Sequence, residues 1–461
     1  MKKICIALMA AAVLGACKNE PKKDTAEFEE KSAYKPISDD VLEEGVIYEA
    51  NIRQYSEEGS FNAFTKDIPQ LKELGVKVIW LMPVYPISGT KSKGSLGSYY
   101  AITDYTSVNP EFGTVDDFRN LVKTAHDNGI YVILDWVANH TGWDHVWIKE
   151  HPEYYTQDEK GNIVDPLNPE TGESWGWTDV ADLSYDNPEM RKEMIEEMLY
   201  WVKEENVDGF RCDVAHQVPV DFWEDAIKEI RAVKPVFMLA EAEQPELLKN
   251  AFDMQYAWEG HHIMNEIARE KKNVKAWDHY MKKNDTLLED DDIFMNFTSN
   301  HDENSWNGTV FERMGDAAET FAAMSYCIPG MPLIYSGQEY DMNKRLLFFE
   351  KDTIVKKKGR FYPFYRKMGA LKNNHPALKG GKKAAAYKRI TTSEDTALLA
   401  FERFSGENKL IFIANLSGED VKASIDYSGK FKNYMTDDDV ELKAEIEYEL
   451  QPWEYLILVQ E

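Results

Sequence analysis

Basic residues, cysteines and long apolar runs are all scarce in this chain of 461 residues. It has 53 lysines and arginines against 81 aspartates and glutamates, which gives a net charge of −28. Like charges repel, so this balance argues against a nucleic acid as the partner. With 43% hydrophobic and 12% aromatic residues, the chain can build a sizeable core, which excludes disorder as the default state. A neutral ligand fits this composition best.

The few cysteines do not form the pattern of a disulfide framework. Cys5 and Cys17 fall in the N-terminal segment, whereas Cys212 and Cys327 lie inside apolar runs. Lone cysteines in apolar runs usually serve as small packing residues. We therefore predict no disulfide framework.

The N-terminal segment has the character of a targeting signal. Residues 1–17, MKKICIALMAAAVLGAC, combine two lysines, a short apolar stretch and small residues before Cys17, as in a secretory signal. The ending LGAC resembles a bacterial lipobox, which implies lipidation of Cys17 and stable attachment to a membrane. An ordinary cleaved signal is the alternative. Residues 17–20, CKNE, are similar to export signals of surface lipoproteins, so the predicted location is the bacterial cell envelope, with the outer membrane preferred.

Beyond a Lys-, Glu- and Pro-rich tether at residues 18–38, short β-type runs alternate with segments of helical periodicity. Eight such runs occur: VIYEANI, VKVIWLMPVY, YVILDWV, VDGFRCDV, VFMLAEA, FDMQYAW, DIFMNFTSN and MPLIYSG. Candidate helices lie between them at residues 61–74, 115–128, 188–205, 220–233, 261–283 and 316–327. Continuous apolar runs are typical of parallel strands that are buried on both faces. Eight strand-helix units predict the α/β class and a (β/α)8 TIM barrel over residues 39–375.

Two segments depart from this rhythm. Residues 141–186, after the third strand, are rich in Trp, Tyr, Pro, Asn and Gly, and we predict a small inserted subdomain over the barrel mouth. Residues 376–461 change to alternating patterns such as ALLAFERF and LIFIANL, which predict a C-terminal all-β sandwich domain.

Polar side chains follow four of the predicted strands. They are Asp135, Asn139 and His140 after the third strand, Arg211, Asp213 and His216 after the fourth, Glu241 after the fifth, and His301 and Asp302 after the seventh. The C-terminal ends of barrel strands face one mouth, so these groups should converge there. Carboxylates, a guanidinium and imidazoles together suit acid/base and nucleophilic chemistry on a polar, neutral substrate.

The segment GFRCDVAH, residues 209–216, places an arginine two positions before an aspartate at the end of an apolar run. Ion pairing with Arg211 should lower the pKa of Asp213 and keep it ionised, as a nucleophile requires. The alternative is a satisfied buried ion pair without function, which the convergence of polar groups from several strands disfavours. Asp135 stands apart, because its carboxylate could simply hold Arg211.

Four short motifs occur along the chain in the order DWVANH (135–140), GFRCDVAH (209–216), LAEA (239–242) and SNHD (299–302). In sequence and in order they resemble the four main motifs of glycoside hydrolase family 13, the α-amylase family. VADLSYDN and GMPLIYSGQE resemble two further segments of that family. The resemblance covers nearly the whole chain after the signal. It implies a retaining enzyme that cleaves α-1,4-glucosidic bonds in starch, glycogen or maltooligosaccharides by double displacement.

The resemblance also implies catalytic roles. Asp213 would be the nucleophile, Glu241 the general acid and then the general base, and Asp302 the carboxylate that stabilises the transition state. Glu241 follows the apolar run FMLA, where desolvation should raise its pKa and keep it protonated while Asp213 stays charged. Retention of configuration requires the two carboxyl groups to stand about 5 to 5.5 Å apart.

Substrate-binding residues follow from the same resemblance. His140, His301 and Arg211 match groups at the cleavage subsite, and Tyr100 in SYYAITDY matches a tyrosine that stacks on the sugar, with Tyr99 as its rival. Four tryptophans could stack on further glucose rings or merely hold their loops together, namely Trp143, Trp175, Trp177 and Trp306.

The predicted mechanism requires no cofactor. Many relatives bind calcium through a histidine four positions after the nucleophile, where this chain has Gln217, with His216 in place of the usual lysine before it. Asn139 is one oxygen ligand, but calcium takes six to eight, and the sequence does not supply them. We therefore predict no metal ligands, and calcium binding remains open.

Other functions within and outside the family stay open. An oligosaccharide-specific α-glucosidase or cyclomaltodextrinase, or a transglycosylase, would use the same three carboxylates. A non-catalytic glucan-binding lipoprotein belongs to a different class, and the presence of all three carboxylates argues against it.

Overall fold

The computed structural model describes residues 35–168 and 171–460. The predicted signal at residues 1–17, with Cys17, and tether residues 18–34 lie outside the described residues. In the described ranges, no helix is both long enough and apolar enough to cross a membrane. Cys212 and Cys327 are buried, free thiols.

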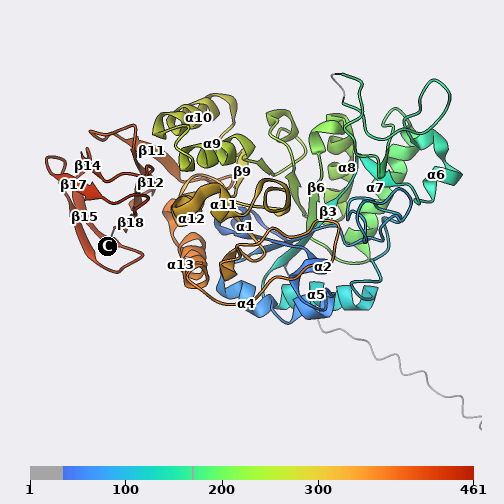
Figure 1. The fold of residues 1–461 in the computed structure, drawn as a ribbon, viewed down its shortest axis with the longest axis horizontal. Coiled ribbons are helices and arrows are strands. Elements are labelled where there is room, and N and C mark those ends of the chain that lie inside the picture. Colours follow the sequence, from blue (N-terminus) through green and yellow to red (C-terminus); the bar gives the residue numbers. More distant parts are fainter. Residues whose placement is uncertain (1–34, 169–170, 461) are drawn as a thin grey trace, which may run out of the picture. The chain divides into compact units, whose positions relative to one another are not determined.

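Eight parallel strands close into a barrel with the order β1-β10-β9-β8-β7-β6-β3-β2 (Figure 1). They are β1 (Ile47–Ala50), β2 (Val78–Leu81), β3 (Tyr131–Trp136), β6 (Gly209–Cys212), β7 (Phe237–Ala240), β8 (Met254–Tyr256), β9 (Ile293–Asn296) and β10 (Met331–Tyr335). Each falls in one of the eight predicted apolar runs. The predicted fold class is therefore confirmed.

Alternation along the strands decides what fills the barrel. Successive strand residues point to opposite faces, so every second side chain points inward. The inward positions form one apolar cluster that includes Ile47, Val78, Ile133, Phe237, Leu239, Met254, Ile293, Met331 and Leu333. Two residues further along, the same alternation brings Glu49, Trp80, Asp135, Arg211 and Glu241 to the inward face. Charged groups therefore occupy the C-terminal end of the barrel while its floor stays apolar.

Helices cover the outside of the barrel, where outward strand residues such as Tyr48 and Leu134 join the largest apolar cluster. The longer helices are α5 (Val115–Asp127), α7 (Pro188–Lys203), α8 (Val220–Val233), α9 (Trp258–Ala268), α10 (Val274–Leu287), α12 (Ala318–Cys327) and α13 (Phe361–Asn374). Short helices are α1 (Asp39–Glu44), α2 (Ile52–Tyr55), α3 (Phe61–Thr65), α4 (Ile68–Glu73) and α11 (Val310–Met314).

Two helices predicted as continuous are broken. The segment 61–74 forms α3 and α4, with Pro69 in the first turn of α4, where its missing N–H is tolerated. The segment 261–283 forms α9 and α10, and the Asn273 side chain caps α10 by accepting from the Lys275 N–H. In both places a local start signal interrupts the apolar periodicity.

The inserted segment after β3, residues 140–186 and called the excursion from here on, contains β4 (His140–Gly142), α6 (Trp147–Glu150) and β5 (Val180–Asp182). β4 and β5 pair antiparallel, with His140 opposite Asp182. Trp147, Tyr154 and Tyr155 are buried and belong to the same cluster as the outer barrel core. Many of the excursion's aromatic residues therefore fasten it to the barrel.

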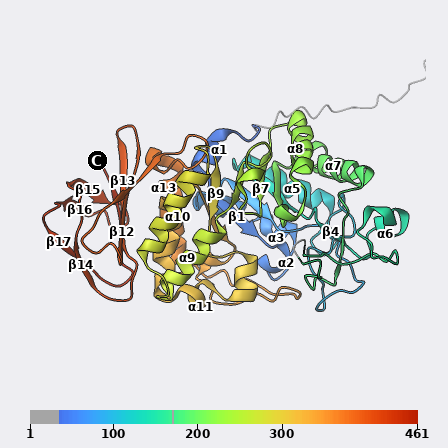
Figure 2. The same ribbon diagram turned by 90° about the horizontal axis from the view of Figure 1, so that it is seen from above.

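The C-terminal strands form a six-stranded antiparallel sheet, β11-β12-β13-β18-β15-β16, and a two-stranded sheet, β14-β17 (Figure 2). Their bounds are β11 (Ala386–Ile390), β12 (Leu398–Ser405), β13 (Asn408–Asn415), β14 (Val421–Ser424), β15 (Gly429–Asn433), β16 (Asp439–Leu442), β17 (Glu447–Leu450) and β18 (Tyr455–Val459). Leu399 and Phe401 of β12 belong to the apolar cluster that lies outside the barrel strands. Leu398 and Ala400 belong to a second cluster, with Val421 of the small sheet. The predicted C-terminal all-β domain is present, and its large sheet contributes to both cores.

Candidate active site

A pocket of about 460 Å³ opens at the C-terminal ends of the barrel strands. Its lining includes six of the seven residues predicted to be catalytic or at the cleavage subsite, namely Tyr100, His140, Asp213, Glu241, His301 and Asp302. A larger cavity, about 640 Å³, lies between α10 and the start of β11 and contains none of them. The convergence of six polar or aromatic groups, rather than size, marks the smaller pocket as the candidate site.

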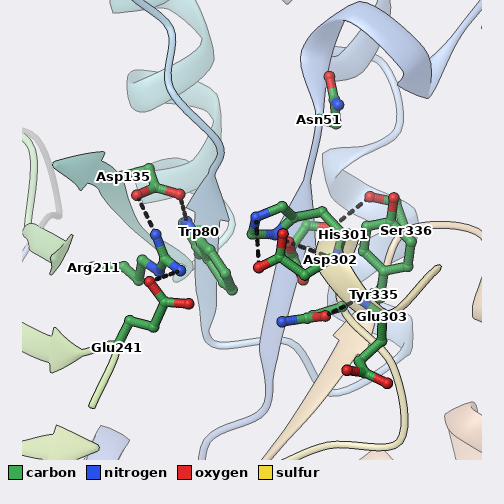
Figure 3. A network of polar contacts seen from close by, with 12 residues as sticks. Asn51, Trp80, Asp135, Arg211, Glu241, His301, Asp302, Glu303, Tyr335 and Ser336 are labelled. Atoms are coloured by element: carbon green, nitrogen blue, oxygen red, sulfur yellow. Dashed lines mark hydrogen bonds and ion pairs between the residues drawn. The ribbon is translucent and has the colours of Figure 1, made fainter. Parts of the chain in front are cut away.

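Arg211 lies at the centre of a buried ion-pair network. Its Nη1 is 2.7 Å from Asp135 Oδ1 and 2.8 Å from Asp213 Oδ1, and its Nη2 is 2.9 Å from Glu241 Oε2. Figure 3 shows the guanidinium between Asp135 and Glu241, with the Trp80 indole beside it. The Nη2 contact is an ion pair without hydrogen-bond geometry. One fully buried cation is therefore shared by three carboxylates.

The predicted lowering of the pKa of Asp213 is wrong. Burial raises its pKa, and the opposing effect of Arg211 does not outweigh burial. Burial is the largest effect, and the nearby charge of Asp302 raises the pKa further. Burial also raises the pKa of Glu241, as its apolar context predicts.

Asp135 contacts protein groups through both carboxylate oxygens. Oδ1 accepts from Arg211, while Oδ2 accepts from Trp80 Nε1 at 3.1 Å and from the Tyr100 hydroxyl at 3.0 Å. Burial raises the pKa of Asp135 to about 7 despite the nearby guanidinium. Because its side chain is fully buried and both oxygens are engaged, Asp135 holds Arg211 and Tyr100.

The backbone directly after Asp213, at the end of β6, adopts an unusual conformation. Val214, directly after Asp213, has φ of 36° and ψ of 45°, the left-handed region that a β-branched residue rarely adopts. In this conformation the Val214 N–H donates to Glu241 Oε2 at 2.8 Å. Strain of this kind concentrates at functional sites, and here it orients a carboxylate that lines the pocket.

The two pocket histidines differ in protonation state. Burial lowers the pKa of His140 to about 4, so its imidazole is neutral at neutral pH. Burial also lowers the pKa of His301, but the carboxylates of Asp302 and Glu49 outweigh it and raise the pKa to about 9. His301 is therefore a cation within the pocket.

The structure distinguishes the two candidate tyrosines. The Tyr100 ring stacks on His301 with centroids 5.6 Å apart and lines the pocket. Tyr99 is 1% exposed, and its ring packs against the Arg53 guanidinium at 4.4 Å. Tyr100 is thus the tyrosine available to a ligand.

The candidate tryptophans divide in the same way. Trp177 and Trp306 line the pocket, and Trp175 stacks on Trp177 with centroids 5.9 Å apart. Trp143 instead donates its indole N–H to the Thr178 carbonyl at 3.1 Å and so holds the excursion together.

Several pocket residues escaped the sequence analysis. Phe348 and Phe349, in the loop after β10, pack against Trp306 with centroid distances of 5.2 and 5.8 Å. Lys93 and Asp179 also line the pocket. Two adjacent phenylalanines after the eighth strand were a usable signal, whereas a single lysine in a polar loop was not.

Glu49 is a further residue that sequence analysis missed, although a glutamate inside the apolar run VIYEANI is itself a signal. It is fully buried, and its Oε1 is 2.6 Å from His301 Nδ1.

The residues expected near a calcium ion are not arranged as calcium ligands. The Asn139 amide nitrogen, rather than its oxygen, faces His140 Nδ1 at 3.3 Å. The neighbouring Asp179 carboxylate is paired with Lys93 at 2.7 Å. His216 lies in the short turn Ala215–Gln217.

Comparison with known proteins places this geometry in a family. The family model described as alpha amylase, catalytic domain, matches residues 38–361. The chain belongs to the α-amylase family. It is 25% identical over 440 residues to Alpha-amylase 3 of Dictyoglomus thermophilum, covering 81% of this chain and 84% of that protein.

Solved structures of α-amylase-family proteins superpose closely on this one. The maltogenic alpha-amylase AmyB of Thermotoga neapolitana has a TM-score of 0.82 at 30% identity, covering 90% of this chain and 98% of that one. An alpha-amylase of Lactobacillus plantarum has a TM-score of 0.82 at 29% identity, covering 92% and 100%. Other matched relatives are named as a cyclomaltodextrinase and as 4-alpha-glucanotransferases. The predicted family is confirmed, and the protein is an α-amylase-type glycoside hydrolase.

Proposed function

We propose that this enzyme is a retaining α-glucan hydrolase that cleaves α-1,4-glucosidic bonds in starch, glycogen or maltooligosaccharides. The observation that carries the proposal is the pocket lined by Asp213, Glu241 and Asp302, which follow three different barrel strands. Stacking surfaces beside these carboxylates, provided by Trp177 and Trp306, suit the apolar faces of glucose rings.

In the first step, Asp213 Oδ2 attacks the anomeric carbon while Glu241 gives its proton to the departing glycosidic oxygen. The C1–O bond breaks and a glycosyl ester of Asp213 forms. In the second step, water attacks the anomeric carbon and gives a proton to Glu241, and the ester bond breaks to release the Asp213 carboxylate. Asp302 binds sugar hydroxyls and stabilises the positive charge that develops in each transition state.

The surroundings of the two carboxyl groups support these roles. Burial raises the pKa of Glu241, which favours the protonated form that an acid needs. Arg211 Nη1 engages Asp213 Oδ1 and offsets the cost of keeping that carboxylate ionised. Since both groups contact one guanidinium, they are held close together. This favours the separation of about 5 to 5.5 Å found in retaining enzymes over the roughly 6.5 to 9.5 Å of inverting enzymes.

The test measures reducing ends released from soluble starch by the wild type and by Asp213→Asn, Glu241→Gln and Asp302→Asn. We expect each substitution to lower kcat by at least about 10³-fold. Asp116→Asn, on the exposed first turn of α5, is the matched control and should act like the wild type. Proton NMR of the first product should show the α-anomer. Equal rates for the wild type and Asp213→Asn, or a β-anomeric product, would refute the assignment.

Product profiles distinguish the alternatives within the family. Relatives named as a cyclomaltodextrinase and as 4-alpha-glucanotransferases keep small-substrate hydrolysis and glycosyl transfer in view. Time courses on starch, maltoheptaose and a cyclodextrin should yield mainly shorter oligosaccharides. Products longer than maltoheptaose would instead identify a transferase, and a strong preference for the cyclodextrin would identify a cyclomaltodextrinase.

We also propose that the protein is exported and anchored to the cell envelope, preferably the outer membrane, by lipid on Cys17. Support comes from residues 1–17, which have the layout of a lipoprotein signal. The full chain and its Cys17→Ser variant would be expressed with an alkyne-tagged fatty acid and then fractionated. Label and membrane association are expected for the wild-type chain and not for Cys17→Ser. A wild-type protein that carries no label and stays off the membrane would contradict the proposal. Antibody labelling of intact cells would report surface exposure.

A further inference from the structure

We propose that Glu49 is a positioning residue that keeps His301 doubly protonated and aimed at Asp302 and Tyr100. The inference rests on the proposed function and assigns a role to a strand β1 residue outside the pocket-lining set. Glu49 lies 252 positions from His301 in the chain, and the closed barrel brings them together through β1 and the loop after β9.

The contact between the two side chains fixes the proton on one ring nitrogen. Glu49 is fully buried, and its Oε1 lies 2.6 Å from His301 Nδ1. The same oxygen accepts from the His301 backbone N–H at 3.3 Å. A carboxylate that accepts both bonds requires a proton on Nδ1 and sets the orientation of the ring.

The other ring nitrogen faces a hydroxyl whose own proton is already directed elsewhere. His301 Nε2 is 2.8 Å from the Tyr100 oxygen, and the Tyr100 hydroxyl donates to Asp135 Oδ2 at 3.0 Å. Asp135 also accepts from Trp80 at the same oxygen and from Arg211 at the other, so both of its oxygens act as acceptors in this arrangement. Tyr100 has one hydroxyl proton, so Nε2 must donate to it. Both ring nitrogens of His301 therefore carry protons.

The charged surroundings of His301 agree with this geometry. The groups that face it are Glu49 from β1, Tyr100 from the loop after β2, Asp135 from β3, Arg211 and Asp213 from the end of β6, Glu241 from the end of β7, and its neighbour Asp302. Carboxylates dominate this set. The pKa of His301 is raised to about 9 because Asp302 and Glu49 outweigh burial and the repulsion from Arg211.

A cationic His301 has a clear chemical use. Its Nε2 is 3.4 Å from Asp302 Oδ2. Burial raises the pKa of Asp302, and the charge of His301 opposes that rise and so favours the ionised form for contacts with the sugar. Glu49 also keeps its second oxygen, Oε2, buried without a hydrogen-bond partner among the described residues. An unsatisfied buried oxygen costs stability, as expected of a group retained for function.

The test is Glu49→Gln in the full chain, which keeps an acceptor for His301 Nδ1 but removes the charge. We measure kcat/KM on maltoheptaose from pH 5 to 10 and follow His301 by NMR of histidine-labelled protein, assigned with His301→Gln. We expect the alkaline limb of kcat/KM to move down by at least about one pH unit, with activity at pH 6 within about tenfold of the wild type. The His301 resonance should titrate at correspondingly lower pH.

Glu339→Gln is the matched control, because Glu339, in the short turn after β10, is also a buried glutamate but accepts from Tyr48 at 2.6 Å instead of contacting His301. Its alkaline limb should stay in place. An unchanged limb in Glu49→Gln would overturn the proposal. If that variant fails to fold, the NMR titration of His301 in the wild type decides. A neutral His301 at pH 7 would overturn the proposal as well. Failure of the proposed function would appear in a different experiment, as an Asp213→Asn variant that is as active as the wild type.

Discussion

Lys93, in the loop after β2, and Asp179, in the excursion after β3, form an ion pair of 2.7 Å at the pocket rim. Lys93 also donates to the Gly176 carbonyl at 3.1 Å, so one ammonium holds both sides of Trp177. The Lys93 side chain is 37% exposed, which limits the strength of the pair.

Lys93→Met should therefore loosen the excursion and weaken stacking on Trp177. We expect KM for maltoheptaose to rise about two- to fivefold, as loss of up to roughly 1 kcal/mol implies, with kcat nearly unchanged. Steady-state kinetics measure this. Lys91→Met is the control, because Lys91 lies over the Trp143 ring rather than the pocket. A fall in kcat with unchanged KM would contradict the assigned role.

Removing Arg211 should be severe, because it would leave buried carboxylates without their shared cation. We expect Arg211→Leu to lower the free energy of unfolding by about 3 to 5 kcal/mol. Arg211→Lys should lose at least about 100-fold in kcat/KM, since one ammonium cannot reproduce the planar contacts to Asp135, Asp213 and Glu241. Urea unfolding and starch hydrolysis are the measurements. Lys123→Leu, in an exposed helical pair, should cost no more than about 1 kcal/mol.

Glu303, directly after Asp302, should make the free energy of unfolding depend on pH in the acid range. Burial raises its pKa, but the hydrogen bond from His261 and the charge of Arg313 bring it down to about 2 from a usual 4.5. A lowered pKa contributes stability above pH 4.5 that is lost as the pH falls towards 2, up to about 3 kcal/mol. Glu303→Gln should therefore flatten this loss.

Urea unfolding at pH 7, 4 and 3 would measure that dependence. Glu407→Gln, at the exposed turn between β12 and β13, is the control and should keep the wild-type slope. If Glu303→Gln loses stability as steeply as the wild type over this range, another group is responsible.

Arg403 of β12 connects the C-terminal sheet to the barrel. It is fully buried and donates to the backbone carbonyls of Cys327 at 2.9 Å, Lys379 at 2.9 Å and Ala385 at 3.0 Å. Arg403→Met would remove these bonds and leave the Cys327 and Ala385 carbonyls without this donor, so we expect a loss of about 3 kcal/mol or more and a lower Tm in calorimetry. Lys430→Met, on an exposed position of β15, should leave Tm within about one degree.

Much of the fold and part of the site could be predicted from local patterns. Eight apolar runs predicted the barrel strands, because burial on both faces leaves a signal within each run. Residues such as Asp213 and Glu241 could be placed at the mouth because side chains alternate along a strand and strand ends share one rim. Breaks within two predicted helices were missed, since apolar periodicity continues across a short interruption.

The sequence by itself determined which residue types reach the barrel mouth, including the three carboxylates and both histidines. Only the tertiary structure decided their partners: Glu49 against His301, Lys93 against Asp179, and one Arg211 shared among three acids. The raised pKa of Asp213 follows from burial, which outweighs the effect of Arg211. Local patterns repeat over two to four residues and can be read along the chain, whereas desolvation and long-range contacts exist only once distant segments pack together.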